Sequence, residues 1–592
     1  MFCESSYRIL HQAAKDGRLP LVEKLLNFGY HVDAVDTEGY TPLFNAVQHQ
    51  RRDMIELLLK NGANVNIRNT RTGIAPIHYL AKTGNASLMA FLFERAWYCI
   101  DPNMSDDGVE RKLAIHLASK FGHAEIVQML LTRTQSLHKD CVSGSGKTPL
   151  MYAAQYNHLP VIRVLAEHSA DVNFTNTKNE GLTALHYAVM SGNKETVTEL
   201  LNMDAHMCPS NISNGMSPVH YAAFIGHVNI LNLLYEYGGS LELPVRDEGG
   251  NLPIHLAAMQ GHEDIVRWIQ ERQRLSLFAW NKLGYTPLHL ATINYRINVM
   301  KYIIDTAGIH VDMTTYDGFR HTALHLASSL GDDSVINCLI DREADVNKMS
   351  AENRYTPLHY ATMKNFPKSI ELLYQAGGNV HVRYGNEGGI AGGEPLLITA
   401  VKYKAYDAAG FLMSEKLGVY PDHKDKDGRT ALHYAVEFGN VELTGSLVSK
   451  GANVNCQDKW KQTPLHYAVQ KGDISLLKEI LRVSPYLSVK DVYGMNAVHL
   501  AALHADVPSL QLLLKDKAYF YVHTSNAARD LPIHLAAYGG NINVVQWIVE
   551  CGVRVDIPNG SGKTALDIAI ERGNKELIHL LKNICVSEGG NE

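Results

Sequence analysis

One seven-residue phrase recurs along the chain, and it constrains the fold more than any other feature. Clear copies are TPLHLAT at 286–292, TALHLAS at 322–328, TPLHYAT at 356–362 and TPLHYAV at 463–469. Aligned on the fourth position, seventeen copies follow one another at spacings of 33 to 38 residues, and thirteen of them carry His there. A period of this length is typical of a repeat array, in which each unit buries its apolar face only against its neighbours.

The fourth residue of each phrase serves as the anchor of its repeat. The anchors are His11, Phe44, His78, His116, Met151, His186, His220, His255, His289, His325, His359, Leu397, His433, His466, His499, His534 and Asp567.

Each repeat predicts two short helices. Thr286 is a suitable N-cap and Pro287 suits the first helical turn. A glycine such as Gly226 then ends the first helix. Apolar residues at helical spacing, such as Ile265 and Ile269, predict a second helix, and a turn rich in Asp, Asn and Gly follows it.

The T-P-L-H-x-A phrase and its period resemble the ankyrin-repeat family over essentially the whole chain. The resemblance implies an all-α repeat solenoid, an ankyrin superhelix of helix-turn-helix units joined by β-hairpin fingers. It also implies that the anchor histidines are structural and tie neighbouring repeats together. We expect a continuous array of about 17 repeats over 1–585, with irregular loops near 99–111 and 385–395, and a short polar tail at 586–592. The glycine-rich loop is either a hinge or a long finger.

Composition narrows the class further. Apolar residues make up 46% of the chain and the net charge is -6, which suits a folded protein without the basic face that nucleic acid requires. The eight cysteines are scattered without a CxxC pair, so neither a disulfide framework nor a zinc site fits. The N-terminus lacks the features of a signal peptide, and no run of 18 apolar residues occurs. We expect a cytoplasmic protein in a reducing compartment, without direct membrane insertion.

Two segments with the letters GSGKT, at 144–148 and 560–564, resemble part of a phosphate-binding loop. Cys141 and Ile557 stand where that loop needs its first glycine. We therefore interpret Lys147 and Lys563 as exposed finger residues. No catalytic motif is present, and the sequence predicts no enzyme activity, no cofactor, no metal and no small-molecule substrate.

A binding surface is predicted from the resemblance, which implies that two residues after the Ala-Ala of each first helix face the concave side. In the central repeats these residues are apolar: Phe121, Tyr156, Met190, Phe224, Ile225, Met259, Ile293, Leu330, Met363, Tyr403 and Phe438. Finger residues add Tyr285, Phe319, Tyr355, Trp460 and Tyr493. Exposed apolar stripes typically mark binding sites. The alternative is that these side chains pack on their own neighbours.

These observations favour a protein-protein interaction scaffold that binds one or more partner proteins along the concave face. Two alternatives stay open. One is an adaptor or regulatory subunit of an enzyme complex, of the ubiquitin ligase or phosphatase type. The other is a cytosolic adaptor that links membrane proteins to the cytoskeleton.

Overall fold

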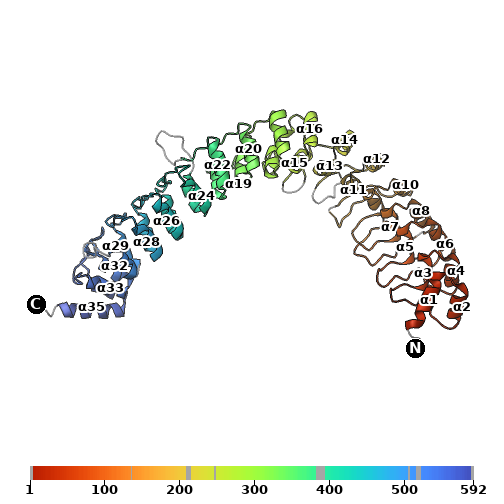
Figure 1. The fold of residues 1–592 in the computed structure, drawn as a ribbon, viewed down its shortest axis with the longest axis horizontal. Coiled ribbons are helices and arrows are strands. Elements are labelled where there is room, and N and C mark those ends of the chain that lie inside the picture. The colour runs from red at the N-terminus through yellow and green to blue at the C-terminus, as the bar shows by residue number, and fades with distance from the viewer. Residues whose placement is uncertain are drawn as a thin grey trace. The chain divides into compact units, whose positions relative to one another are not determined.

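A computed structural model describes the chain except for residues 1–3, 135, 180, 209–214, 246–248, 382–393, 505–506, 515–521 and 589–592. The chain forms two compact units, Met1–Ala307 and Gly308–Glu592. Both are built from pairs of antiparallel helices, of which we call the one that carries the anchor residue the first helix and its successor the second helix (Figure 1).

The first unit contains nine helix pairs in its described residues. Its first helices are α1 (Glu4–Asp16), α3 (Pro42–Gln48), α5 (Pro76–Thr83), α7 (Ala114–Phe121), α9 (Pro149–Gln155), α11 (Ala184–Ser191), α13 (Pro218–Ile225), α15 (Pro253–Gln260) and α17 (Pro287–Ile293). Its second helices are α2 (Leu19–Asn27), α4 (Arg52–Lys60), α6 (Ala86–Ala96), α8 (Ala124–Arg133), α10 (Leu159–Glu167), α12 (Lys194–Asn202), α14 (Val228–Glu236), α16 (Glu263–Arg272) and α18 (Ile297–Lys301). A 3-10 turn, η1 (Ser276–Phe278), and a π-helical segment, η2 (Tyr302–Thr306), complete it.

The second unit contains eight pairs in the part of it that the structure describes. Its first helices are α19 (Ala323–Leu330), α21 (Pro357–Met363), α23 (Leu396–Lys402), α25 (Ala431–Phe438), α27 (Pro464–Lys471), α29 (Ala497–His504), α32 (Pro532–Gly539) and α34 (Ala565–Arg572). Its second helices are α20 (Asp333–Ile340), α22 (Pro367–Gln375), α24 (Tyr406–Leu412), α26 (Val441–Ser449), α28 (Ile474–Leu481), α30 (Val507–Leu513), α33 (Ile542–Glu550) and α35 (Lys575–Glu588).

The repeat phrase sets where each first helix begins. All seventeen anchors lie in first helices, which confirms the predicted all-α repeat solenoid. Where the phrase begins with Thr and the anchor is not His, this Thr is an extended N-cap whose hydroxyl accepts the expected backbone bond. The amide of Phe44 donates to Thr41 Oγ1 at 3.1 Å, and the amide of Met151 donates to Thr148 Oγ1 at 3.3 Å.

Burial of small side chains brings the first helices close together. Within each unit every first helix packs on the next, and the second helices form a row beside them (Figure 1). Ala118 of α7 and Ala153 and Ala154 of α9 are fully buried at such contacts. Ile126 and Leu130 of α8 close the core from the other side. Each repeat therefore buries its apolar face against its neighbours, as a solenoid requires.

The fingers are tight turns held by a side-chain cap. Asp458 Oδ1 accepts from the amides of Trp460 at 2.9 Å and Gln462 at 2.8 Å. Backbone bonds join successive finger tips, for example from the amide of Lys459 to the Asp427 carbonyl at 2.8 Å. Across the described residues the fingers form isolated β-bridges, such as Ser105 to Leu113, and no extended strand. The side-chain caps and the backbone bonds between finger tips stabilise the fingers, as inter-strand hydrogen bonds stabilise a longer β-hairpin.

Of the two irregular loops, the one near 99–111 lies within the described residues. The loop near 99–111 is a long finger, in which the amide of Asp106 donates to the Lys112 carbonyl at 2.8 Å and the Lys112 amide returns to Asp106 Oδ1 at 2.7 Å. Most of the loop at 385–395 and the end of the predicted tail, 589–592, lie outside the described residues. Whether the glycine-rich loop is a hinge stays a prediction.

Candidate protein-binding surface

Most anchor histidines link their own repeat to the next. In anchors such as His78, His186 and His433 the N-cap amide donates to Nδ1, so that the proton lies on Nε2 and points to a carbonyl of the following finger. For His325 the two distances are 3.1 Å from the Thr322 amide and 3.0 Å to the Tyr355 carbonyl. For His116 they are 3.0 Å from Leu113 and 3.0 Å to Cys141. The structural role that the resemblance implied is confirmed.

Burial keeps these rings neutral. It lowers the pKa of His116, His186 and His255 in the first unit to about 4. It does the same for His325, His359, His433 and His499 in the second unit. A neutral ring with both nitrogens engaged is a structural element, and proton uptake would break the bond to Nδ1.

A second set of histidines, which the sequence reasoning missed, ties the end of some first helices to the next repeat. The Nε2 atoms of His123, His158 and His262 contact the carbonyl oxygens of Lys82, Lys120 and Phe224 at 3.2, 2.9 and 3.1 Å. Each of these residues follows its anchor by seven positions, and that spacing is the signal that could have found them.

Glycine is required where these rings lie. Gly122 ends α7 with φ of +83°, and a Cβ on it would lie 2.6 Å from Nδ1 of His158. Gly226 ends α13 with φ of +105°, and a Cβ would lie 2.7 Å from Cε1 of His262. Both the left-handed backbone and the space taken by the ring exclude a side chain.

In the first unit, four predicted residues form a row over successive repeats. Phe121, Tyr156, Met190 and Phe224 are 41, 43, 42 and 37% exposed. They stand at the ends of α7, α9, α11 and α13, which pack on one another in that order. We call these four the apolar ladder. Three further predicted residues of this unit are only half-buried: Ile225, Met259 and Ile293.

In the second unit the predicted stripe is shorter. Tyr403 and Phe438, at the ends of the neighbouring helices α23 and α25, are exposed. Leu330 and Met363 are half-buried. The longest run of exposed residues in the expected stripe is therefore the apolar ladder, although Tyr403 and Phe438 are individually more exposed, at 51 and 45%.

The predicted finger residues divide into two groups. Phe319, Trp460 and Tyr493 are exposed. Tyr285 and Tyr355 are half-buried and pack on the anchors of their own repeats, with Tyr355 stacked on His359 at a ring distance of 4.9 Å. For these two, the alternative of packing on neighbours describes what the structure shows.

One interpretation needs correction. Lys147 is half-buried and not an exposed finger residue, because its ammonium lies over the rings of Tyr152 and Tyr187 and donates to Gln155 at 2.8 Å. Lys563, by contrast, has a side chain that is 44% exposed.

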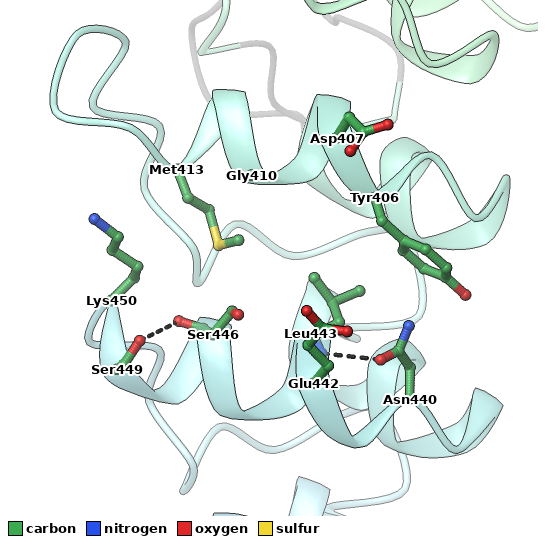
Figure 2. A pocket seen from close by; sticks show the side chains of 10 residues that line it. All are labelled: Tyr406, Asp407, Gly410, Met413, Asn440, Glu442, Leu443, Ser446, Ser449 and Lys450. Atoms are coloured by element: carbon green, nitrogen blue, oxygen red, sulfur yellow. Dashed lines mark hydrogen bonds between the residues drawn. The ribbon is translucent and has the colours of Figure 1, made fainter.

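A hollow of about 470 Å³ lies between the second helices α24 and α26 (Figure 2). Tyr406 and Met413 line one side, and Leu443 and Ser446 line the other (Figure 2). A Cβ on Gly410 would meet no atom within 4 Å, so the hollow arises because a small residue stands where a larger one would fill the groove. Its lining is mostly polar and contains no arrangement for catalysis.

Two further kinds of feature are absent from the described part of the chain: a membrane-spanning helix and a metal-binding cluster. None of its helices has the length and apolar character needed to cross a membrane. The same residues contain no cluster of three or more His, Cys, Asp or Glu side chains placed to hold a metal ion.

Comparison with known proteins defines the class. The profile of ankyrin repeats (3 copies) matches residues 10–106, 77–176, 173–244, 241–317, 309–384, 385–458, 439–524 and 498–587. Together with the helix pairs and the anchor bonds, these matches show that the chain belongs to the ankyrin-repeat family.

Several relatives match parts of the chain. Transient receptor potential cation channel subfamily A member 1 of Homo sapiens is 27% identical over 458 residues, which cover 75% of this chain and 39% of the channel. The Drosophila melanogaster channel of the same name is 24% identical over 394 residues, 63% of this chain and 32% of the channel. Human inversin is 27% identical over 234 residues, 38% of this chain and 21% of inversin. The chain thus spans about a third of the length of the channels that it matches.

Proposed function

We propose that this chain is a protein-protein interaction scaffold without catalysis of its own, and that a partner protein binds along the apolar ladder. The observation that carries the proposal is the ladder itself, in which Phe121, Tyr156, Met190 and Phe224 are each more than a third exposed in successive repeats. Aromatic and Met side chains in a contiguous row are typical of protein interfaces. The half-buried Ile225, Met259, Ile293, Leu330 and Met363, the exposed Tyr403 and Phe438, and the fingers extend the candidate surface.

The chemistry of the remaining polar groups supports binding over catalysis. Anchor rings such as His116 are held neutral by burial and have both nitrogens engaged, so they are not available as acids, bases or ligands. An ankyrin array supplies a rigid surface, and its variable side chains decide what binds. We further propose a continuous array to residue 585, and the consecutive family matches support its continuity. A cytoplasmic location is also part of the proposal.

The test is capture of partners from cell lysate by the wild-type chain and by a Phe224→Glu/Met259→Glu variant, with identification by mass spectrometry. Specific partners should bind the wild type and be lost from the variant, because carboxylates on the last ladder residue and on Met259 of the next repeat oppose burial of apolar side chains. Leu275→Glu is the matched control, since Leu275 is 79% exposed in the same unit but lies outside the ladder.

Circular dichroism must first show that all three proteins have the same helix content. Capture of the same partners by wild type and double variant would place binding elsewhere and contradict the proposal.

A second candidate is an array that serves a membrane protein. It is favoured by the similarity to two cation channels, one of which matches 75% of this chain. In that case the chain should sediment with cell membranes, and the association should disappear from vesicles made of the extracted lipids alone. Recovery only in the supernatant of intact membranes would reject this candidate.

A further inference from the structure

Three repeats place a cation at the same finger position, directly before the N-cap Thr. In two of them the cation pairs with a carboxylate eight residues later on the first helix. Arg429 Nη1 donates to Glu437 Oε2 at 3.0 Å, and Lys563 Nζ donates to Glu571 Oε2 at 2.8 Å. In the third repeat the cation is Lys147, and the residue eight positions later is a neutral amide, Gln155.

In both units the cation lies over two tyrosine rings, and Arg429 also lies 5.2 Å from the centre of the Trp460 ring. The Arg429 guanidinium lies 5.5 Å from the centre of the Tyr434 ring and 5.3 Å from that of Tyr467. The Lys147 ammonium lies 5.5 Å from the Tyr152 ring and 4.7 Å from the Tyr187 ring. Such rings attract a cation through their negative faces, so both sites favour a positive charge.

The finger groups beneath these rings differ in charge. In the second unit they are carboxylates, because Tyr434 donates to Asp425 at 2.7 Å and Tyr467 donates to Asp458 at 2.8 Å. The Arg429 site therefore holds three carboxylates, including Glu437.

In the first unit the equivalent finger groups are neutral. Tyr152 contacts the hydroxyl of Ser143 at 3.2 Å, and the amide of Asn176 donates to the hydroxyl of Tyr187 at 3.1 Å. With Gln155, all three carboxylates of the Arg429 site are replaced by neutral groups around Lys147.

Further lysines increase the positive charge at this site. Glu110 is the carboxylate that acts on Lys147, and it is already paired with Lys112. Burial opposes the charge of Glu110, but Lys112, Lys147 and Lys120 together still lower its pKa. Burial lowers the pKa of Lys147; Glu110 counteracts this, while repulsion from Lys120 and Lys112 adds to it. Among the described residues, no carboxylate oxygen lies within 4.0 Å of the Lys147 ammonium.

Lys120 connects this site to the apolar ladder. Its ammonium lies 5.3 Å from the centre of the Tyr156 ring and 5.9 Å from that of Phe121. Lys120 and Phe121 belong to the repeat of α7, and Lys147 and Tyr156 belong to the next repeat, that of α9, which packs on it.

We propose that Lys147, held between Tyr152 and Tyr187 and supported by Lys120, receives an Asp or Glu carboxylate from an acidic segment of the partner protein, whose apolar residues cover Phe121 and Tyr156. This inference rests on the proposed scaffold function and names the chemistry of its partner. The partner's carboxylate supplies, beside the Gln155 amide, the negative charge that Glu437 and Glu571 supply in their own repeats. A half-buried ammonium that pairs with no carboxylate of the described residues forms a strong, charge-assisted bond to such a group, and long-range attraction speeds its arrival.

The test introduces the missing carboxylate through Gln155→Glu. Gln470→Glu is the matched control, because Gln470 has the same place on α27 but the finger residue before its N-cap Thr is Gln462, not a cation. A library of random 12-residue peptides displayed on phage is selected against wild type, Q155E and Q470E, all with wild-type helix content by circular dichroism.

Peptides selected by wild type and by Q470E should be enriched in Asp and Glu beside apolar residues, and this enrichment should vanish for Q155E. The most enriched peptide should bind Q155E at least about 10-fold more weakly in fluorescence anisotropy, and replacing its carboxylates by amides should weaken binding to the wild type similarly.

Equal acid content in the wild-type and Q155E selections, or no enriched peptide from either, would overturn the acidic-partner inference. Loss of lysate partners from the Phe224→Glu/Met259→Glu variant decides the scaffold proposal independently. If those partners are lost from that variant but bind Q155E as well as wild type, the scaffold function holds and only the acidic-partner inference fails.

Discussion

Lys147 in the first unit and Arg429 in the second occupy the same place in their repeats and meet opposite electrostatic conditions. Arg429 is neutralised within the chain by Glu437, with Asp425 and Asp458 beneath the adjoining rings. Lys147 has the same rings but meets Gln155, Ser143 and Asn176. The difference shows that one repeat backbone can carry either a self-contained ion cluster or an open cationic site. The charge differs at three corresponding places, where Glu437, Asp425 and Asp458 of the second unit meet Gln155, Ser143 and Asn176 of the first.

Acid should act on both units alike, because both contain anchor rings with pKa values near 4. The unfolded rings titrate near 6.5, so the unfolded chain binds protons first as the pH falls, and stability is lost between about pH 6.5 and 4. At pH 5 each such ring should cost about 2 kcal/mol relative to neutral pH. Pulsed hydrogen exchange with mass spectrometry at pH 7, 6 and 5 can follow each unit. A loss of stability at acid pH in only one of the two units would contradict the shared role of the anchor histidines.

Replacement of the cation should change the stability of the two units by different amounts. Arg429→Met removes the partner of Glu437 and the cation over the Tyr434 and Tyr467 rings, whose hydroxyls donate to the buried Asp425 and Asp458, and should destabilise the second unit by about 2 kcal/mol. Lys147→Met removes an ammonium that has no carboxylate partner and should change the first unit by under about 1 kcal/mol. Local stability from hydrogen exchange in α25 and α9 is the measurement. Equal losses in both units would mean that Lys147 is neutralised as well as Arg429.

The smallest expected contrast concerns the tyrosine hydroxyls. Tyr467→Phe leaves the buried Asp458 without the donor at 2.8 Å and should cost about 1.5 kcal/mol. Tyr152→Phe leaves only neutral hydroxyls and Glu110, which keeps Lys112, and should cost about 0.5 kcal/mol. Thermal unfolding monitored in both variants should rank them in this order, and the reverse order would contradict the assignment of charge to the second unit's fingers.

The repeat phrase predicted most of the fold, because each copy contains its own start and stop signals. The positions that Thr286 and Pro287 occupy begin a first helix, and the position that Gly226 occupies ends one. All seventeen anchors therefore lie in first helices. The exposed members of the stripe could also be placed, since their position after the Ala-Ala pair is constant. Their degree of exposure could not, because it depends on side chains of the neighbouring repeat, as Tyr355 on His359 illustrates.

The electrostatics of Lys147 were not predicted, for a related reason. In one dimension GSGKT at 144–148 and at 560–564 are the same letters, yet one lysine meets Gln155 and the other meets Glu571. The relevant neighbours lie eight residues downstream and in the adjoining repeats. Only alignment of whole repeats, finger with first helix, makes the missing carboxylate visible.

The glycine-histidine contacts between repeats have a consequence for how such a chain changes over time. Gly122 with His158 and Gly226 with His262 are the same joint, built from main-chain atoms and one ring. A repeat can therefore be duplicated, lost or exchanged without redesign of the junction on either side. A side chain proposed for recognition, such as Lys147, stays with its repeat in such an exchange. The order of binding residues along the array can then change while the contacts that keep it folded stay the same.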